Sequence, residues 1–245
     1  MIKILSKPQQ ASGAFNNGEI IENKPIGFPR ENLQGNGAYS NLFYWAHAKA
    51  TTDSTIGLHP HQGFEICSFV LKGEIRHYDT KLREWRPLSA GDAQIIRAGN
   101  GISHSEFMAQ GAEMFQIWFD PNLQKTLQQP ASYDDYKAAQ FPVNEANGLV
   151  STIIVGNDSP FRMDTPGIRV RQEKIRSGSL QLPLDANTVY SFYLLSGELT
   201  LNGKSLNVSD FFIVNAETGI ELESSSEAEW FVIESPSNPG YRTYA

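Results

Sequence analysis

SFVLKGE at residues 68–74 recurs as SFYLLSGE at residues 191–198, with one inserted residue in the second copy. In each copy an aspartate that follows a small residue, Asp92 or Asp210, precedes a further apolar run. Short runs of β-branched and aromatic residues, separated by glycine and asparagine turns, are typical of strands in a sandwich or barrel. A repeat of such runs indicates one β-domain that has been duplicated.

The segment between the two copies has a different character. Residues 122–139 carry few turn-forming residues, Pro121 suits a first helical turn, and Pro130 divides the segment. We therefore expect an all-β protein with a short helical linker, an N-terminal domain over residues 1–140 and a C-terminal domain over residues 141–245. The length of 245 residues suits two domains of about 120 residues each.

Composition narrows the class of protein further. There are 27 acidic and 20 basic residues and no basic run, which argues against direct binding of nucleic acid. Cys67 is the only cysteine, so neither an intrachain disulfide nor a thiolate metal cluster is possible. No apolar stretch approaches the ~18–20 residues that span a bilayer, and the first residues are too charged for a signal peptide. We expect a cytoplasmic protein without membrane contact.

Two histidines stand two residues apart in the first copy, at His59 and His61. Side chains alternate between the faces of a strand, so both imidazoles are expected on one face. Pro60 between them lacks an N–H group and favours an extended backbone. Two imidazoles placed in this way can bind one metal ion.

A second pair with the same spacing, His104 and Glu106, follows the glycine-rich turn at residues 99–101. If the two segments face each other across a sandwich, they present three nitrogens and one carboxylate oxygen to a single ion. Such a donor set suits Fe(II) and also other divalent first-row metals. The alternative interpretation is that these polar side chains line a solvated face of a sheet.

The second copy provides an internal comparison. Aligning Ser68 with Ser191 places the two histidines of the first pair on Leu182 and Leu184, and aligning Asp92 with Asp210 places His104 and Glu106 on Leu222 and Ser224. All four candidate ligands change together. We therefore expect a C-terminal domain with an apolar interior and without a metal site.

The residues His59-Pro60-His61-x-Gly63-Phe64-Glu65, Gly73-Glu74, Gly91-Asp92 and Ala98-Gly99-x-Gly101-Ile102-x-His104-Ser105-Glu106 resemble the pirin family of the cupin superfamily. The match is dense from about residue 57 to residue 108. The resemblance implies two tandem cupin domains, which are jelly-roll β-sandwiches, with a degenerate second cupin. It also implies that His59, His61, His104 and Glu106 bind one divalent metal ion, usually iron, with zinc, nickel, copper, manganese and cobalt left open.

The same resemblance implies two different functions. Several bacterial pirins oxidise the flavonol quercetin with dioxygen, so the first hypothesis is a metal-dependent dioxygenase that resembles quercetin 2,3-dioxygenase. The alternative is a non-enzymatic, metal-dependent redox regulator that binds a protein partner, and a third hypothesis is action on another small molecule. In the enzymatic hypothesis Glu106 or Glu65 is the candidate base that takes the substrate's hydroxyl proton.

Two positions depart from the family's pattern near the expected mouth of the pocket. Gln62 stands where the family often has a basic residue, and Tyr44-Trp45-Ala46-His47-Ala48 replaces its usual acidic and aromatic motif. We expect His77 to face solvent in a charged hairpin. The candidate aromatic walls of a substrate pocket are Phe43, Trp45, Phe64, Phe107, Met108, Phe115 and Trp118, although aromatic residues in strands are more often core.

Overall fold

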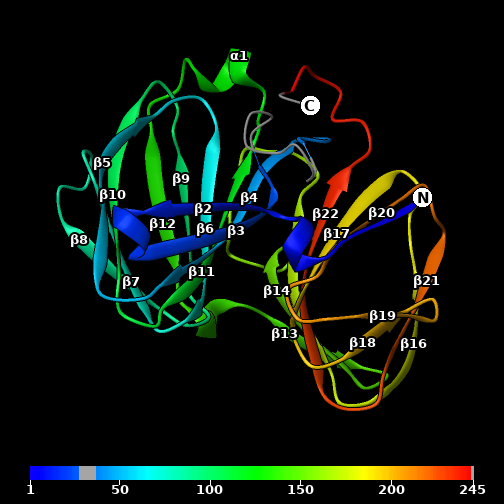
Figure 1. Ribbon diagram of the computed structural model, residues 1–245. Helices are drawn as coiled ribbons and strands as arrows, with labels where there is room; N and C mark the ends of the chain where they lie inside the picture. Colours follow the sequence, from blue (N-terminus) through cyan, green and yellow to red (C-terminus); the bar gives the residue numbers. More distant parts are fainter. Residues whose placement is uncertain (28–36, 244–245) are drawn as a thin grey trace. The chain divides into compact units, whose positions relative to one another are not determined.

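The protein is described by a computed structural model, in which residues 1–27 and 37–243 are placed (Figure 1). The chain divides into two compact units. The N-terminal unit comprises Gln10–Gln140, Met163–Pro166 and the segment from Tyr241 onward, and the C-terminal unit comprises Met1–Gln9, Phe141–Arg162 and Gly167–Gly240. Within the described residues no helix is long and apolar enough to cross a membrane.

The N-terminal unit contains a seven-stranded and a four-stranded antiparallel sheet. In spatial order the larger sheet consists of β12 (Ser132–Tyr136), β9 (Ala93–Arg97), β6 (Glu65–Lys72), β11 (Glu113–Phe119), β4 (Leu42–Ala50), β3 (Ile20–Ile26) and β2 (Ala11–Phe15). The smaller sheet consists of β5 (Ser54–His61), β10 (Ile102–Met108), β7 (Glu74–Asp79) and β8 (Trp85–Ser89). Short 3-10 helices occupy Asn16–Gly18 and Ala138–Gln140.

The C-terminal unit has the same arrangement of a seven-stranded and a four-stranded antiparallel sheet. Its larger sheet consists of β1 (Ile2–Leu5), β20 (Phe211–Asn215), β17 (Thr188–Ser196), β22 (Ala228–Pro236), β15 (Arg169–Ile175), β14 (Leu149–Val155) and β13 (Val143–Ala146). Its smaller sheet consists of β16 (Gly178–Pro183), β21 (Gly219–Ser224), β18 (Leu199–Leu201) and β19 (Lys204–Leu206). A 3-10 helix at Lys7–Gln9 follows β1. The predicted duplicated β-architecture is confirmed.

Two features of the units depart from a simple division of the chain at residue 140. The first nine residues lie with the C-terminal unit because β1 pairs with β20, from Ile2 opposite Val214 to Leu5 opposite Phe211. Residues 163–166 lie with the N-terminal unit, where the backbone N–H groups of Asp164 and Thr165 donate to Glu65.

The expected helical linker holds one short helix, α1 (Leu123–Thr126). Its second half is instead strand β12, which pairs with β9 and alternates Tyr133 and Asp135 with side chains on the other face. Exposed and more buried residues alternate along Ser132-Tyr133-Asp134-Asp135-Tyr136, which is the pattern of a strand. The low frequency of turn residues in this segment had favoured a helix instead.

Strand registers refine the correspondence between the two copies. His104 pairs with His59, and Ile220 pairs with Leu182. Glu106 pairs with His77, and Leu222 pairs with Leu201. The expected match of His104 and Glu106 with Leu222 and Ser224 is therefore wrong by two residues, because the chain from Asp210 to the residue opposite Leu182 is two residues shorter than the chain from Asp92 to the residue opposite His59. The equivalent residues are Ile220 and Leu222.

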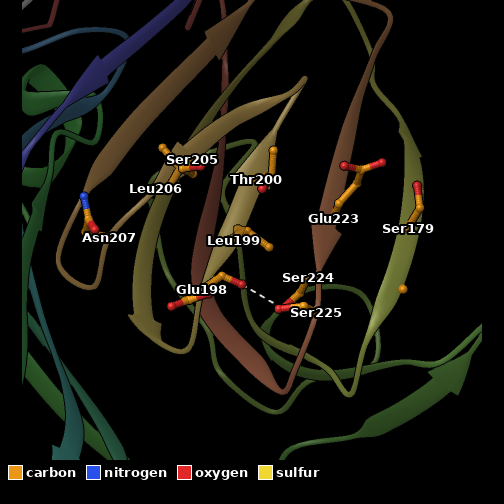
Figure 2. Close-up of a pocket in the computed structure, with 11 residues that line it drawn as sticks. Ser179, Glu198, Leu199, Thr200, Ser205, Leu206, Asn207, Glu223, Ser224 and Ser225 are labelled. Atoms are coloured by element: carbon orange, nitrogen blue, oxygen red, sulfur yellow. Dashed lines mark hydrogen bonds between the residues drawn. The ribbon is translucent and has the colours of Figure 1, made fainter.

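A large apolar cluster lies between the two sheets of the C-terminal unit. Ile220 and Leu222 belong to it, and Leu182 and Leu184 pack against it. All four positions that match the candidate ligands are therefore apolar and in the core. A separate cavity of about 580 Å³ lies against the smaller sheet of this unit and is lined by serine, threonine and leucine side chains with Glu198 and Glu223 (Figure 2).

Two glycines of the C-terminal unit lie in tight turns between strands of its smaller sheet or beside it. Gly197 precedes β18 with a φ of +81°, and a methyl group there would overlap the carbonyl oxygen of Glu227 and lie 2.7 Å from the Cα of Ala228. Gly203 has a similar φ of +78° but has open space around it.

We predict that Gly197→Ala lowers the free energy of unfolding by about 2–5 kcal/mol, through left-handed backbone strain and steric overlap together. Gly203→Ala is the matched control and should cost only about 1–2 kcal/mol, since it adds the strain without the overlap. Urea denaturation followed by circular dichroism measures both changes. Equal losses in the two variants would contradict the steric argument.

Candidate metal centre

Strands β5 and β10 bring three histidines together in the N-terminal unit. The two strands are antiparallel neighbours in one sheet, with His59 directly opposite His104 and His61 opposite Ile102. The sequence suggested that the two strands face each other across the sandwich, but they lie side by side in one sheet. Side chains on neighbouring strands still share one face of the sheet, so the imidazoles converge.

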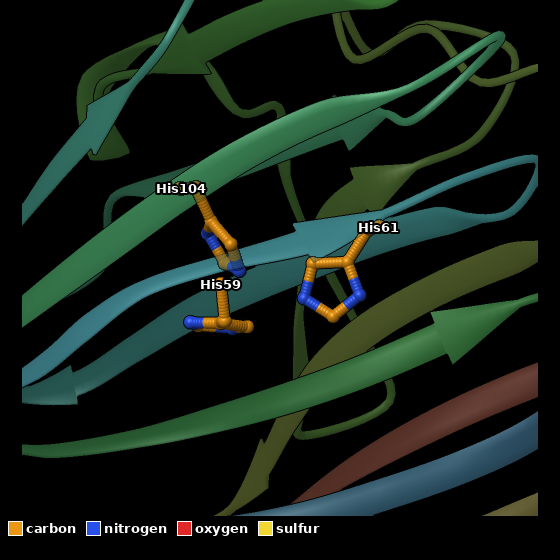
Figure 3. Close-up of side chains that lie close together, drawn as sticks. All are labelled: His59, His61 and His104. Carbon is orange, nitrogen blue, oxygen red and sulfur yellow. The ribbon is translucent and has the colours of Figure 1, made fainter.

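The three imidazoles form a compact cluster (Figure 3). One ring nitrogen from each of His59, His61 and His104 lies within 4.8 Å of the others. Ring centroids are 4.4 Å apart for His59 and His104, and 4.9 Å apart for His61 and His104. All five histidines of the sequence lie in this unit, and this trio is the metal-binding group found among the described residues.

The environment keeps the imidazoles of His61 and His104 neutral. Burial, together with repulsion from His104 and His59, lowers the pKa of His61 to about 3. Burial, together with repulsion from His59 and His77, lowers the pKa of His104 to about 2. A neutral imidazole has a free lone pair, which is the form that binds a metal ion.

Unpartnered buried nitrogens test whether these residues fit a metal ion. Both ring nitrogens of His104 and the Nε2 of His61 are buried and have no hydrogen-bond partner. Leaving a buried polar atom unpaired costs on the order of 1–3 kcal/mol. A metal ion bound through one nitrogen of each ring would give His61 and one side of His104 the partner that they lack, so the donor set fits a divalent metal.

The orientation of His59 is set by the backbone. Its Nδ1 lies 2.8 Å from the carbonyl oxygen of Gly57. A carbonyl oxygen only accepts hydrogen bonds, so Nδ1 carries the proton and Nε2 is the free donor atom. Metal-binding histidines commonly donate their second nitrogen to a carbonyl or carboxylate in this way.

Glu106 lies in the same interior but outside the close trio. Its side chain is 1% exposed, and its negative charge acts on the pKa of His61 in the opposite direction to burial, offsetting a small part of the lowering. Its carboxylate accepts hydrogen bonds from Gln116 at 2.6 Å and from Ser68 at 3.4 Å. Its part as a fourth ligand remains a prediction.

The carboxylate of Glu65, the second candidate base, is hydrogen-bonded to residues outside the histidine trio. Its carboxylate accepts hydrogen bonds from the backbone N–H groups of Asp164 and Thr165 at 2.7 and 2.9 Å, and from the Thr165 hydroxyl at 2.5 Å. Glu65 and Ser68 stand three residues apart on β6, so they lie on opposite faces. We therefore do not retain Glu65 as a base or ligand; it anchors residues 163–166 instead.

Sequence analysis missed a buried pair beside the trio. His77 and Asp79 are both 0% exposed, and His77 Nε2 lies 2.7 Å from an Asp79 oxygen. The expectation that His77 faces solvent is wrong. The charged neighbours misled it, whereas the alternation along β7, in which Ile75, His77 and Asp79 share one face, contains the correct signal.

The candidate aromatic residues separate into two groups. Phe64 and Trp118 each lie 5.3 Å from the His61 ring, and Phe43 lies 5.3 Å from Phe64. The contacts of the other four lie elsewhere: Trp45 packs on Phe115, Met108 is in a separate apolar cluster, and Phe107 lies beneath Arg76.

The two departures from the family's pattern, at Gln62 and in the segment that contains His47, lie in different surroundings. Gln62 lines a cavity of about 560 Å³ together with His61, Thr80 and Ser103, and its amide donates to the carbonyl of Asn100. His47 instead contacts Phe115 and lies 3.1 Å from a carboxylate oxygen of Glu113. Tyr44 of the same segment stacks on Trp118 at 4.3 Å, so both changes lie beside residues that border His61.

Two tandem sandwiches with a histidine-lined interior in the first define a bicupin. Residues 31–119 match the family model described as Pirin. These findings confirm the resemblance to the pirin family and the cupin fold of both domains.

Particular relatives support this assignment. Over 68 residues the chain is 40% identical to quercetin 2,3-dioxygenase of Escherichia coli K12, covering 26% of this chain and 29% of the relative. Alignments span 35% to 54% of the lengths of the first three curated relatives, so the chain matches about half of each or less.

Solved structures extend the likeness to the whole fold. A crystal structure of quercetin 2,3-dioxygenase from Acinetobacter baumannii superposes with a TM-score of 0.81 at 20% identity, covering 96% of this chain and 79% of that one. The bacterial pirin YhhW of Escherichia coli in complex with nickel(II) gives 0.79 at 21% identity, covering 96% and 99%.

The lowered pKa of His104 predicts a pH-dependent stability of the metal-free protein. Between its folded pKa of about 2 and the ordinary value of 6.5, the unfolded chain binds a proton that the folded chain does not. Stability from this group is therefore present above pH 6.5 and falls as the pH is lowered. At pH 5 the loss relative to pH 7 is on the order of 1–2 kcal/mol.

Urea denaturation of chelator-treated protein at pH 7 and pH 5 measures this loss. His104→Leu should reduce it, whereas Gln172→Met, which changes no ionisable group, should leave it unchanged. If His104→Leu loses as much stability as the unaltered protein does, the titration of His104 is not its cause.

Proposed function

We propose that the protein is a metal-dependent dioxygenase that resembles quercetin 2,3-dioxygenase and cleaves flavonol-type substrates with dioxygen. The observation that carries the proposal is the close trio of imidazoles, in which His61 and His104 have buried nitrogens without a hydrogen-bond partner. It is supported by the relatives and structural neighbours named for this activity.

We assign His59, His61 and His104 as ligands of one divalent ion, with Glu106 as the fourth. When bound, a divalent metal supplies a Lewis acid that lowers the pKa of a hydroxyl group attached to it. The nitrogen-rich donor set is compatible with Fe(II), which we propose as the native ion, and also with zinc, nickel, copper, manganese and cobalt.

Residues around the centre suit a planar aromatic ligand. Phe64 and Trp118 flank His61 with apolar ring surfaces, on which a flavonol ring can pack. His61 also borders the cavity of about 560 Å³, a volume within the roughly 300–1,000 Å³ of small-molecule sites. Gln62 and Ser103 at this cavity offer polar groups for ring hydroxyls.

Glu106 is the carboxylate that we assign to accept the hydroxyl proton of the substrate. The other buried carboxylate nearby, Asp79, already accepts hydrogen bonds from His77 and from the backbone N–H groups of Lys81 and Leu82. Burial of Glu106 away from bulk water keeps that proton within the site.

Metal analysis and oxygen uptake test the proposal together. We predict that purified protein contains about one equivalent of metal and that His59→Ala and His104→Ala reduce this content at least tenfold. His47→Gln changes a histidine outside the centre and should retain the metal. Oxygen consumption with a panel of flavonols should require the metal and fall in the two ligand variants in proportion to metal loss.

Two results would oppose the proposal at different points. Unchanged metal content in both ligand variants would show that the proposed metal centre is wrong. Metal binding without oxygen uptake, for any flavonol and with iron, copper, nickel or manganese, would remove the enzymatic function and favour a regulatory protein with a protein partner.

A further inference from the structure

A continuous chain of buried hydrogen bonds ends on the carboxylate of Glu106. On one side, the Trp118 indole donates to the Gln116 oxygen at 3.2 Å, and the Gln116 amide donates to Glu106 Oε2 at 2.6 Å. On the other side, the Gln94 amide donates to Ser68 Oγ at 3.1 Å, and Ser68 donates to Glu106 Oε1 at 3.4 Å. The donors come from β6, β9 and β11 of the larger sheet, whereas Glu106 lies on β10 of the smaller one.

Chemistry fixes the direction of every bond in this chain. An indole N–H only donates, so the oxygen of the Gln116 amide faces Trp118 and its NH₂ group faces Glu106. A carboxylate only accepts, so the Ser68 hydroxyl donates to Glu106 and accepts from the NH₂ group of Gln94, whose oxygen lies 3.2 Å from the Tyr133 hydroxyl. Both branches therefore deliver hydrogens to Glu106, the arrangement that an acceptor-only carboxylate requires.

The two oxygens of Glu106 are held unequally. The contact between Gln116 and Oε2, at 2.6 Å, is a short charge-assisted hydrogen bond. The contact between Ser68 and Oε1, at 3.4 Å, is long and weak. Oε1 is thus the oxygen with capacity left for a further partner.

The second copy shows that these donors change as a group. The strand registers place Ser68 opposite Gln94 and Gln116, and Phe192 opposite Phe212 and Val232. The structural equivalent of Ser68 is therefore Phe192, one residue beyond the Ser191 of the sequence alignment. All three replacements belong to the apolar cluster of the C-terminal unit, together with Leu222, the equivalent of Glu106. The donors are thus absent where the carboxylate and the histidines are absent.

We propose that Gln116 and Ser68, oriented by Trp118 and Gln94, are positioning residues that hold Glu106 so that its Oε1 binds the metal ion. This inference rests on the proposed metal centre and specifies how its fourth ligand is organised. The network fixes the carboxylate before metal binding, which removes the entropy cost of ordering it at that moment.

Gln116→Met tests the inference because it keeps the length of the side chain and removes both amide groups. We expect the dissociation constant for Co(II), measured by competition with a chromophoric chelator, to rise about 10–100-fold. We also expect the visible absorption of bound Co(II) to change in shape toward that of Glu106→Gln, because loss of the carboxylate alters the ligand field. Ser68→Ala should give a smaller rise, in line with its longer bond.

Gln172→Met is the matched control, since Gln172 donates to Glu229 at 2.7 Å in the C-terminal unit. It should leave both the affinity and the spectrum unchanged. If Gln116→Met fails to fold, Trp118→Phe and Ser68→Ala, which delete single donors, provide the same two measurements.

The outcomes separate this inference from the metal centre. If His104→Ala abolishes Co(II) binding while Gln116→Met, Trp118→Phe and Ser68→Ala keep the affinity and spectrum of the unaltered protein, the positioning role is wrong and the centre stands. If His104→Ala itself binds Co(II) normally, the centre is wrong. A loss of thermal stability in the Gln116 variant without a spectral change assigns the network a structural role only and overturns the inference.

Discussion

The antiparallel pairing of β5 with β10 is the constraint on which the candidate centre depends. Because His59 stands directly opposite His104, the imidazoles are brought together by backbone hydrogen bonds rather than by the side chains themselves. A shift of one residue in this register would turn one set of ligands to the other face of the sheet. Pro60 restricts the backbone of β5, and Gly99 and Gly101, with φ angles of +50° and +130°, permit the sharp turn that leads into β10.

The two units have the same fold, but the interior of one is apolar and the equivalent positions of the other are polar. In the C-terminal unit, leucine, isoleucine, valine and phenylalanine form a continuous apolar cluster. In the N-terminal unit the equivalent positions carry histidine, glutamate, glutamine and serine, whose burial is unfavourable unless each polar atom has a partner. A bound ion and a hydrogen-bond network that converges on Glu106 are the two means by which this interior can satisfy them.

Sequence patterns predicted the duplicated β-fold and the convergence of His59, His61 and His104, because period-two spacing specifies which side chains share a face. They could not place Glu65 correctly, since its hydrogen-bond partners at residues 164 and 165 lie about a hundred positions away along the chain. They also could not reveal the Gln116 network, whose members come from three strands that are separated in sequence. His77 was recoverable from the alternation along β7, but its charged neighbours obscured the pattern.

The pairing of β1 with β20 has a consequence for how the molecule is made. Residues 2–5 complete a sheet whose partner strand is synthesised about two hundred residues later. Closure of so long a loop is slow relative to local strand pairing, so the apolar strand Phe211–Asn215 remains an open edge until it occurs. An open apolar edge invites pairing with other chains, and a fragment beginning at residue 141 would keep that edge permanently.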